Sequence, residues 1–342
     1  MNKPVILTGL RANNDLHIGN YFGALLPIVD MAKNKSDDYR VNLMLADLHS
    51  FTTPIDHHRL QKQITENLRA YVAAGLPLDN DNIHLFRQSY VPAHSELTVV
   101  LDSFTGMGEM SRMTQFKDKS AQLSEDRVSV GLFNYPVLMA VDILLYGSKY
   151  VPVGDDQTQH LEFTRDIAER MNKRFGELFV VPEPVKKQHE FFGKDQGLRI
   201  KDLADPSKKM SKSEESDKGV IFLNDDPEAA RKKIMSATTD DLSQVKYDPD
   251  NQPGVSNLLQ IYALLSEKDV KEAEKEFVNT AKYSDFKQVV ADKVVEFLSD
   301  FQDKLFRVDQ KAINSKLVSS ESAMNKTATE TLSKVQKAVG LR

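Results

Sequence analysis

A lysine-rich pentapeptide carries the strongest chemical signal in this chain. It reads Lys209-Met210-Ser211-Lys212-Ser213 and follows the loop sequence Asp205-Pro206-Ser207-Lys208. Two lysines three residues apart, among small hydroxyl side chains that leave backbone N–H groups accessible, can surround a triphosphate and offset the charge of a departing pyrophosphate. A solvated lysine-rich loop is the alternative. We predict a phosphate-binding loop, because five fixed residues recur by chance in roughly one such chain in ten thousand.

A second candidate phosphate site follows the first predicted strand. The segment from Thr8 to Asn20 contains two glycines and ends with His17 and Asn20, one turn apart at the start of a predicted helix. In a parallel sheet, ligands bind beyond the carboxyl ends of the strands, where glycine permits close backbone approach and a helix N-terminus favours phosphate. A simple capped turn explains the same residues, so the segment gains weight only together with the lysine loop.

One carboxylate stands among apolar and aromatic residues in the segment 135–146. Pro136 suits the first turn of a helix, and Tyr135, Met139, Asp142 and Tyr146 then share one helix face. A buried aspartate is costly unless it accepts hydrogen bonds, and an indole N–H is a donor-only group that supplies one. An internal arginine or a backbone amide is the alternative partner for this carboxylate.

Short apolar runs predict the buried strands of a parallel α/β sheet that positions these motifs. The runs are 5–7, 41–45, 83–86, 151–153 and 220–223. Apolar residues at helical spacing from Leu60 to Val72, with Gly75 placed to end the helix, predict a crossover helix. From about residue 225 the pattern indicates a second, helical domain. Its predicted helices are 227–237, 254–265, 267–279, 284–306 and 322–339.

Composition limits the chemistry and the compartment. The 342 residues include no cysteine, which excludes disulfides, thiolate nucleophiles and cysteine-ligated zinc. No apolar run reaches the roughly 18 residues of a membrane span and no signal-peptide pattern is present, so we expect a cytoplasmic protein without membrane contact. The net charge of -5 gives no overall attraction to nucleic acid. Residues 301–342 carry a net +4, which fits RNA contact and a solvated helix face equally well.

Together the motifs resemble those of the class I aminoacyl-tRNA synthetases. The sequence His17-Ile18-Gly19-Asn20 is similar to their His-Ile-Gly-His signature, and Lys209 to Ser213 is their second signature in full. Three further stretches, 108–119, 135–146 and 151–157, resemble the bacterial type of the tryptophanyl-tRNA synthetase family. The resemblance runs through nearly the whole chain and is weakest after about residue 265.

The resemblance implies an α/β fold with two domains. A Rossmann-type parallel-sheet catalytic domain would occupy residues 1–205, with a helical insertion at about 92–130 that forms a dimer interface. The phosphate loop and a helical, anticodon-binding C-terminal domain would occupy residues 206–342. The implied partners are L-tryptophan, ATP and tRNA(Trp) within a homodimer. Mg²⁺ would arrive with ATP, and no metal held by protein ligands alone is expected.

The resemblance also implies roles for individual residues. The catalytic group would be His17, Asn20, Lys119, Lys209 and Lys212. ATP would be bound by Arg11, Ala12, Asn13, Gly19, Asn20, Gly154, Asp155, Asp156, Ile200, Lys209, Met210, Ser211, Lys212 and Ser213. Tryptophan would be bound by Gly9, His49, Tyr135, Met139, Asp142 and Gln157. For His49 a satisfied core histidine is the commoner outcome.

The implied reaction is attack of the tryptophan carboxylate on the α-phosphorus of Mg-ATP, followed by transfer from the adenylate to the tRNA's terminal adenosine. Catalysis would come from positioning and charge, without a covalent nucleophile. A tyrosyl-tRNA synthetase is the nearest alternative, but the stretches 108–119 and 135–146 look tryptophanyl. A non-catalytic binding paralogue is a further alternative, which the two intact phosphate lysines disfavour.

One stretch departs from the family pattern. Family members usually carry Gln-Pro-Ser/Thr-Gly before the first signature, whereas this chain has Arg11-Ala12-Asn13-Asn14. Asparagine tolerates left-handed backbone geometry better than most residues, so Asn13 and Asn14 are expected to preserve the turn. Arg11 adds a cation beside the expected nucleotide.

Overall fold

The computed structural model describes most of the chain. The described residues are 3–10, 12–13, 15–52, 55–121, 128–154, 157–193, 199–211, 217–280 and 282–342, except for the side chains of 119 and 121. Among them, no helix is both long and apolar enough to cross a membrane.

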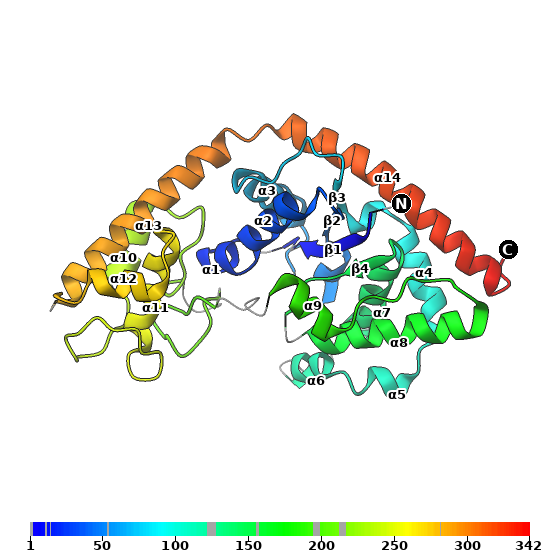
Figure 1. Cartoon of the computed structure of the whole chain (residues 1–342), viewed down its shortest axis with the longest axis horizontal. Coiled ribbons are helices and arrows are strands. Elements are labelled where there is room, and N and C mark those ends of the chain that lie inside the picture. The colour runs from blue at the N-terminus through cyan, green and yellow to red at the C-terminus, as the bar shows by residue number, and fades with distance from the viewer. Residues whose placement is uncertain are drawn as a thin grey trace.

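Four parallel strands form the central sheet, in the order β3-β2-β1-β4 (Figure 1). The strands are β1 (Val5–Leu10), β2 (Arg40–Leu45), β3 (Ile83–Arg87) and β4 (Ser148–Tyr150). From β1 the chain adds β2 and β3 on one side and then returns to add β4 on the other side. The strand order therefore reverses between β1 and β4, and such a switch point is where open parallel sheets bind ligands.

Helices cover both faces of the sheet. The helices and helical turns of this part of the chain are α1 (Ile18–Asn20), a π-helical turn (Tyr21–Leu25), α2 (Leu26–Lys35), a 3-10 turn (Leu48–Thr52), α3 (Leu60–Ala73), a 3-10 turn (Gln88–Tyr90), α4 (Ala93–Asp102), α5 (Met107–Met110), α6 (Thr114–Ala121), α7 (Val130–Leu144), α8 (Thr158–Phe175) and α9 (Val185–Phe192). Side chains alternate along β1: Ile6 packs with α2 and α3, whereas Leu7 packs with α4, α7 and α8. The predicted α/β architecture is confirmed.

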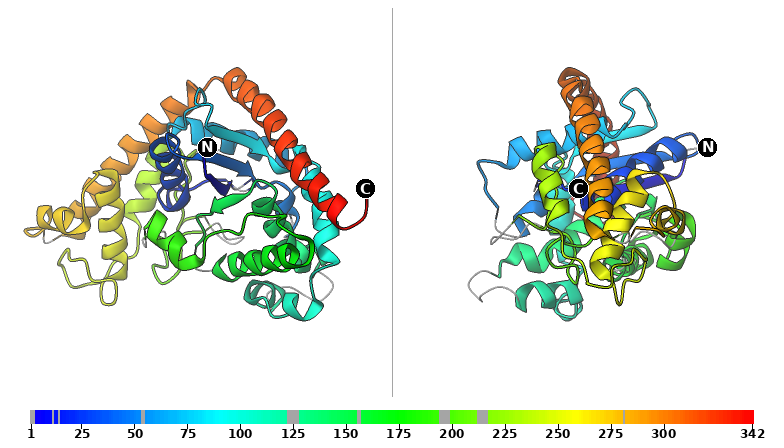
Figure 2. Two further views of the ribbon diagram at one scale, coloured as in Figure 1. Left: turned by 45° about the vertical axis from the view of Figure 1, so that its right-hand side comes forward. Right: turned by 90° about the vertical axis from the view of Figure 1, so that its left-hand side faces the viewer.

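The C-terminal third is helical, as predicted. It comprises α10 (Pro227–Met235), α11 (Pro253–Leu265), α12 (Val270–Glu276), α13 (Tyr283–Phe306) and α14 (Gln310–Ala338). Helices α10 to α13 pack together, while α14 turns back and lies along β3 and α4 (Figures 1 and 2). The last helix thus adds to the sheet-containing part of the molecule.

Two predicted strands are wrong. Residues 151–153 extend beyond β4 without joining the sheet, because Pro152 has no N–H and the Val151 N–H donates to the Gln188 side chain at 3.0 Å. The run 220–223 forms only an isolated antiparallel bridge between Phe222 and His17, whose short partner segment cannot extend a ladder.

Some predicted helix limits are also wrong. Helix α7 begins at Val130, where Ser129 caps it by accepting from the Leu132 N–H, so Pro136 lies inside the helix and not in its first turn. Helix α14 begins at Gln310, twelve residues before the prediction, because part of its buried face is polar.

Candidate active site

The first signature forms a closed hydrogen-bonded turn at the start of α1. The Asn20 N–H donates to His17 Nδ1 at 3.3 Å, and the His17 N–H donates to Asn20 Oδ1 at 3.2 Å. A side chain at Gly19 would place its Cβ 3.0 Å from His17 Nδ1 and 3.5 Å from Ile200 Cβ, so glycine permits this close approach. The predicted capped turn and helix N-terminus are therefore both present.

Main-chain hydrogen bonds join this turn to the segments on either side of the lysine-rich loop. The Ile18 N–H donates to the Ile221 carbonyl at 3.0 Å, and the Leu223 N–H donates to the Leu16 carbonyl at 2.9 Å. The Met210 N–H donates to the Ile200 carbonyl at 3.0 Å and closes the other side of the loop.

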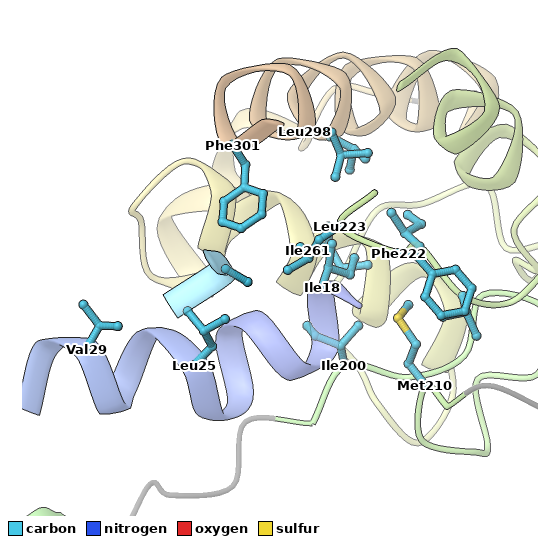
Figure 3. Close-up of a cluster of buried hydrophobic side chains, with 14 of the residues drawn as sticks. Ile18, Leu25, Val29, Ile200, Met210, Phe222, Leu223, Ile261, Leu298 and Phe301 are labelled. Atoms are coloured by element: carbon cyan, nitrogen blue, oxygen red, sulfur yellow. The ribbon is translucent and has the colours of Figure 1, made fainter. Parts of the chain in front are cut away.

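Apolar side chains pack between the first signature (residues 17–20) and the lysine-rich loop (residues 209–213). Figure 3 shows Ile18 of the first signature beside Ile200, Met210 and Phe222, and all four are buried. Lys209 and Ser211 stay exposed on either side of Met210. A buried methionine between two exposed polar residues anchors the loop while its lysine remains available to a ligand. Lys212 and Ser213 lie outside the described residues.

A pocket of about 190 Å³ brings together all six predicted tryptophan-binding residues. They are Gly9, His49, Tyr135, Met139, Asp142 and Gln157, and the remaining lining is apolar: Leu7, Met44, Ala46, Ile143 and Val151. Gly9 has no atom within 4 Å of the place its Cβ would occupy, so the floor of the pocket beside it is open. The pocket offers an apolar slot with one carboxylate, which suits a flat apolar ligand that carries a donor.

Asp142 has three side-chain hydrogen-bond partners among the described residues. It is 2% exposed. Its Oδ1 accepts from Gln88 Nε2 at 2.7 Å and lies 2.7 Å from His94 Nδ1, while its Oδ2 lies 2.8 Å from His49 Nε2. Burial would raise the pKa of Asp142, but the hydrogen bonds of His49 and His94 outweigh burial and hold that pKa below its usual range. The carboxylate therefore stays ionised and acts only as an acceptor.

A buried tyrosine completes the network behind the carboxylate. The Tyr146 hydroxyl lies 2.7 Å from His94 Nε2. Burial and the nearby charge of Asp142 raise the pKa of Tyr146 well above its ordinary value, so the phenol keeps its proton. A neutral His94 that donates from Nδ1 to Asp142 and accepts at Nε2 from Tyr146 satisfies every group. Tyr146, which was predicted to share a helix face with Asp142, lies just beyond the end of α7 and does not line the pocket.

Gln88 and His94 were missed by the sequence analysis. Both are 0% exposed and contact Asp142 directly. The partners expected for Asp142 were an indole, an arginine or a backbone amide, and the observed ones are two histidines and a glutamine amide. One signal was present, because Gln88 follows immediately after a buried strand, where parallel sheets place ligand-binding groups.

A second pocket, of about 340 Å³, lies at the switch point between β1 and β4. It is lined by Thr8, Gly9, Phe22, Gly23, Ala24, Pro27, Ile28, Met31, Pro152, Gly154 and Phe192. Gly9 borders both pockets, so the two cavities adjoin. The π-helical turn from Tyr21 to Leu25 supplies part of the wall, and such turns often occur at functional sites.

Several other predicted site residues do not line the larger pocket or lie outside the described residues. Ala12 is buried and Asn13 is half-buried, in the loop between β1 and α1. Arg11, Asp155 and Asp156 lie outside the described residues, as does the side chain of Lys119, which belongs to α6. Gln157 caps no backbone group of α8 with its side chain and faces the smaller pocket.

The chain is similar to known proteins over nearly its whole length. The family model for class I tRNA synthetases (W and Y) matches residues 1–299. The parallel sheet, the capped His-x-x-Asn turn and the lysine-rich loop agree with this match. The chain is therefore a class I aminoacyl-tRNA synthetase by family.

Individual relatives show which branch of this class the chain belongs to. A tryptophan--tRNA ligase from Leifsonia xyli is 43% identical over 342 residues, which is 99% of this chain and 97% of that protein. A tryptophan--tRNA ligase from Malacoplasma penetrans is also 43% identical, covering 98% of both chains. The crystal structure of tryptophanyl-tRNA synthetase from Mycoplasma pneumoniae has a TM-score of 0.82 at 33% identity and covers 99% of this chain and 98% of its own. This chain belongs to the tryptophan–tRNA ligase family.

Proposed function

We propose that this chain activates L-tryptophan with ATP and transfers it to tRNA(Trp). The observation that carries the proposal is the ionised, buried Asp142 at the wall of an apolar pocket that shares Gly9 with a second pocket at the switch point between β1 and β4. A tryptophanyl-tRNA synthetase from Campylobacter jejuni, solved in complex with ADP and tryptophan, has a TM-score of 0.80 at 30% identity and covers 98% of this chain and 99% of its own. The two ligands named for that relative, ADP and tryptophan, support the proposal that one pocket binds the amino acid and the other the nucleotide.

The indole would bind in the smaller pocket. Oδ1 of Asp142 already accepts from Gln88 and His94, so Oδ2 is the oxygen that would receive the indole N–H. An ionised carboxylate oxygen has two acceptor positions, and His49 uses one of those on Oδ2. Gly9 and Met139 would border the ring. Gln157 and the Tyr135 hydroxyl would hold the ammonium or carboxylate group.

The nucleotide would lie across the switch point, with its phosphates at the first signature and the lysine loop. In the capping box Asn20 uses its side-chain oxygen, so its amide nitrogen would donate to a phosphate together with His17. Gly19 and Ile200 would form a close-fitting wall for the base, and Gly154, Asp155 and Asp156 would meet the ribose. Lys209 and Lys212, and Lys119 from α6, would neutralise the departing pyrophosphate.

The reaction needs no covalent enzyme intermediate. The tryptophan carboxylate attacks the α-phosphorus and the bond to pyrophosphate breaks, and the terminal adenosine hydroxyl of the tRNA then displaces AMP from the adenylate. Mg²⁺ would enter bound to the ATP phosphates, which it prefers to all-protein cages. Over the described residues, no group of three or more His, Cys, Asp or Glu side chains is arranged to hold an ion.

The chain would act as a cytoplasmic homodimer with two domains, 1–205 and 206–342. Support for the dimer comes from three strongly exposed apolar side chains, Val99, Met107 and Val130, in and beside the segment 92–130. The helical part around α10 to α13 would reach the anticodon. Because α14 lies along β3, the last helix would belong structurally to the catalytic part.

Charging of purified tRNA(Trp) with labelled tryptophan tests the proposal. We expect tryptophan to be esterified to tRNA(Trp), and the reaction to require ATP. Charging of tRNA(Tyr) with tyrosine would move the chain to the other branch of the family, and absence of any charging would indicate a binding paralogue.

A further inference from the structure

The C-terminal helix α14 covers the exposed edge of the sheet with polar side chains. Strand β3 is the outermost strand, so alternate N–H groups of β3 have no partner within the sheet. The Leu85 N–H donates to Ser320 Oγ at 3.1 Å, and the Arg87 N–H donates to Glu321 Oε1 at 3.3 Å. The side chains of Ser320 and Glu321 thus accept hydrogen bonds from β3, as the backbone of a neighbouring fifth strand would. They come from a helix more than 230 residues away in sequence.

Glu321 also forms a two-pronged ion pair with Arg87. Oε1 accepts from Arg87 Nε at 2.6 Å and Oε2 accepts from Nη2 at 2.9 Å. The two side chains are 18% and 9% exposed, so water screens the pair only weakly. The Arg87 guanidinium lies 3.4 Å from the centre of the Tyr90 ring, and Asn325 Nδ2 donates to the Tyr90 carbonyl at 2.9 Å. Helix α14 therefore holds the turn Gln88–Tyr90 on both sides.

Gln88 lies between these two anchored residues and reaches into the pocket wall. Its Nε2 donates to Asp142 Oδ1, and its Oε1 accepts from the Leu48 N–H at 3.2 Å. Leu48 precedes His49, which contacts the other oxygen of Asp142. The side-chain amide of Gln88 therefore holds the Asp142 carboxylate and also the backbone next to His49.

We propose that Glu321 is a positioning residue for amino-acid selection: through Arg87 it fixes Gln88, and Gln88 aims the Asp142 carboxylate at the indole. The inference rests on the proposed role of Asp142 in binding tryptophan. It gives the C-terminal helix a part in substrate specificity, in addition to any contact with RNA. Loss of the Glu321–Arg87 pair lets Gln88 shift while His49 and His94 still hold Asp142, so the carboxylate stays ionised but is aimed less well at the indole. This change weakens one directed hydrogen bond and leaves the apolar contacts intact.

The test compares Glu321→Gln with a control on the same helix. Glutamine keeps the size of the side chain but turns an acceptor into a donor that faces Arg87 Nη2. The control is Lys316→Met, which removes a 2.8 Å hydrogen bond from α14 to the Asn80 carbonyl, at the opposite end of β3 from Gln88. Dissociation constants for tryptophan and phenylalanine are measured on the full chain by equilibrium dialysis, with ATP affinity measured alongside.

We expect Glu321→Gln to weaken tryptophan binding about tenfold, as for partial loss of a hydrogen bond to a charged group, and to change phenylalanine binding by less than about twofold. The ATP affinity of Glu321→Gln should match that of the wild type. The affinities of Lys316→Met for tryptophan and for phenylalanine should also match those of the wild type. A helix that serves only stability would lower the affinity for both amino acids together. An unchanged tryptophan-to-phenylalanine ratio in Glu321→Gln, equal to that of Lys316→Met, overturns the proposal.

A second variant covers the case in which Glu321→Gln does not fold. Replacement of both partners, Arg87→Met with Glu321→Gln, removes the buried charges together, a change that is often neutral for stability, and the glutamine oxygen can still accept from the main-chain N–H at position 87. It should fold and still lose the selectivity ratio, and a folded double variant with wild-type selectivity overturns the proposal. A wild-type chain that binds no tryptophan overturns the proposed function itself, a failure visible before any substitution is made.

Discussion

Replacement of Asp142 by asparagine should sharply reduce the preference for tryptophan over phenylalanine while the pocket keeps its shape. Two donors, Gln88 Nε2 and His94 Nδ1, face Oδ1, whereas a single histidine nitrogen faces Oδ2. The new amide will therefore place its oxygen at the Oδ1 position and its NH₂ group at the Oδ2 position. There the NH₂ group meets the indole N–H, so a donor faces a donor.

The magnitude follows from the hydrogen bond that is lost. A hydrogen bond to a charged group contributes about 1.5 to 3 kcal/mol, and the indole N–H is then buried without a partner. We expect tryptophan affinity to fall about 100-fold, which corresponds to about 2.7 kcal/mol. Phenylalanine, which has no donor to offer, should bind about as well as to the wild type. Selectivity would therefore fall by the same factor of about 100.

Fluorescence provides a direct assay, because the protein has no tryptophan of its own. Titration of the chain into free tryptophan reports binding as a change in ligand emission, and competition with phenylalanine gives the second constant. Asp142→Ala is a poorer variant, since it leaves Gln88 and His94 buried without their acceptor and lowers stability as well. Unchanged tryptophan affinity and unchanged rejection of phenylalanine in Asp142→Asn would refute the reasoning, and Asp142 would then be a structural carboxylate.

Three further predictions concern Lys209 in the loop, Gly219 and the half-buried His84. Lys209→Ala should slow adenylate formation about 100-fold in single-turnover assays and leave tryptophan binding nearly unchanged, because its contact strengthens as charge develops on pyrophosphate; equal losses would contradict this. Gly219→Ala places a Cβ 1.9 Å from the Asp202 carboxylate and should cost about 1 to 3 kcal/mol in urea denaturation, and a wild-type midpoint would count against it. Burial and nearby cations lower the pKa of His84 from 6.5 to about 4, so the unfolded chain binds more protons in that range and stability falls as pH drops through it. The full shift is discounted for partial exposure to about 2 kcal/mol, and His84→Gln should flatten the pH dependence of the denaturation midpoint, whereas an unaltered profile would exclude His84 as its source.

The parts of the fold that follow local rules could be predicted from the sequence. β1 to β3 are short apolar runs, and α3 combines helical spacing with Gly75, whose φ of +100° ends the helix as predicted. Helix α10 has an aspartate cap and a proline at its start. The apolar face around Asp142 likewise predicted its burial and its place in a pocket.

What escaped prediction depends on contacts between distant segments. The N-terminal half of α14 buries Ser320 and Glu321, and such polar residues look like a solvent-facing surface until β3 is placed beside them. Gln88 and His94 come from two different elements that only the folded chain brings to Asp142. Their functional meaning depends on direction and distance, which residue types and spacing along the chain do not encode.

The central claim is that the chain activates tryptophan, and ATP–pyrophosphate exchange tests it most directly. With purified protein, Mg-ATP and labelled pyrophosphate, exchange into ATP should require tryptophan. Phenylalanine should support exchange about 10⁴-fold less efficiently, as expected for a site built around one substrate hydrogen bond. Exchange that tyrosine supports as well as tryptophan, or no exchange with any amino acid, would contradict the account.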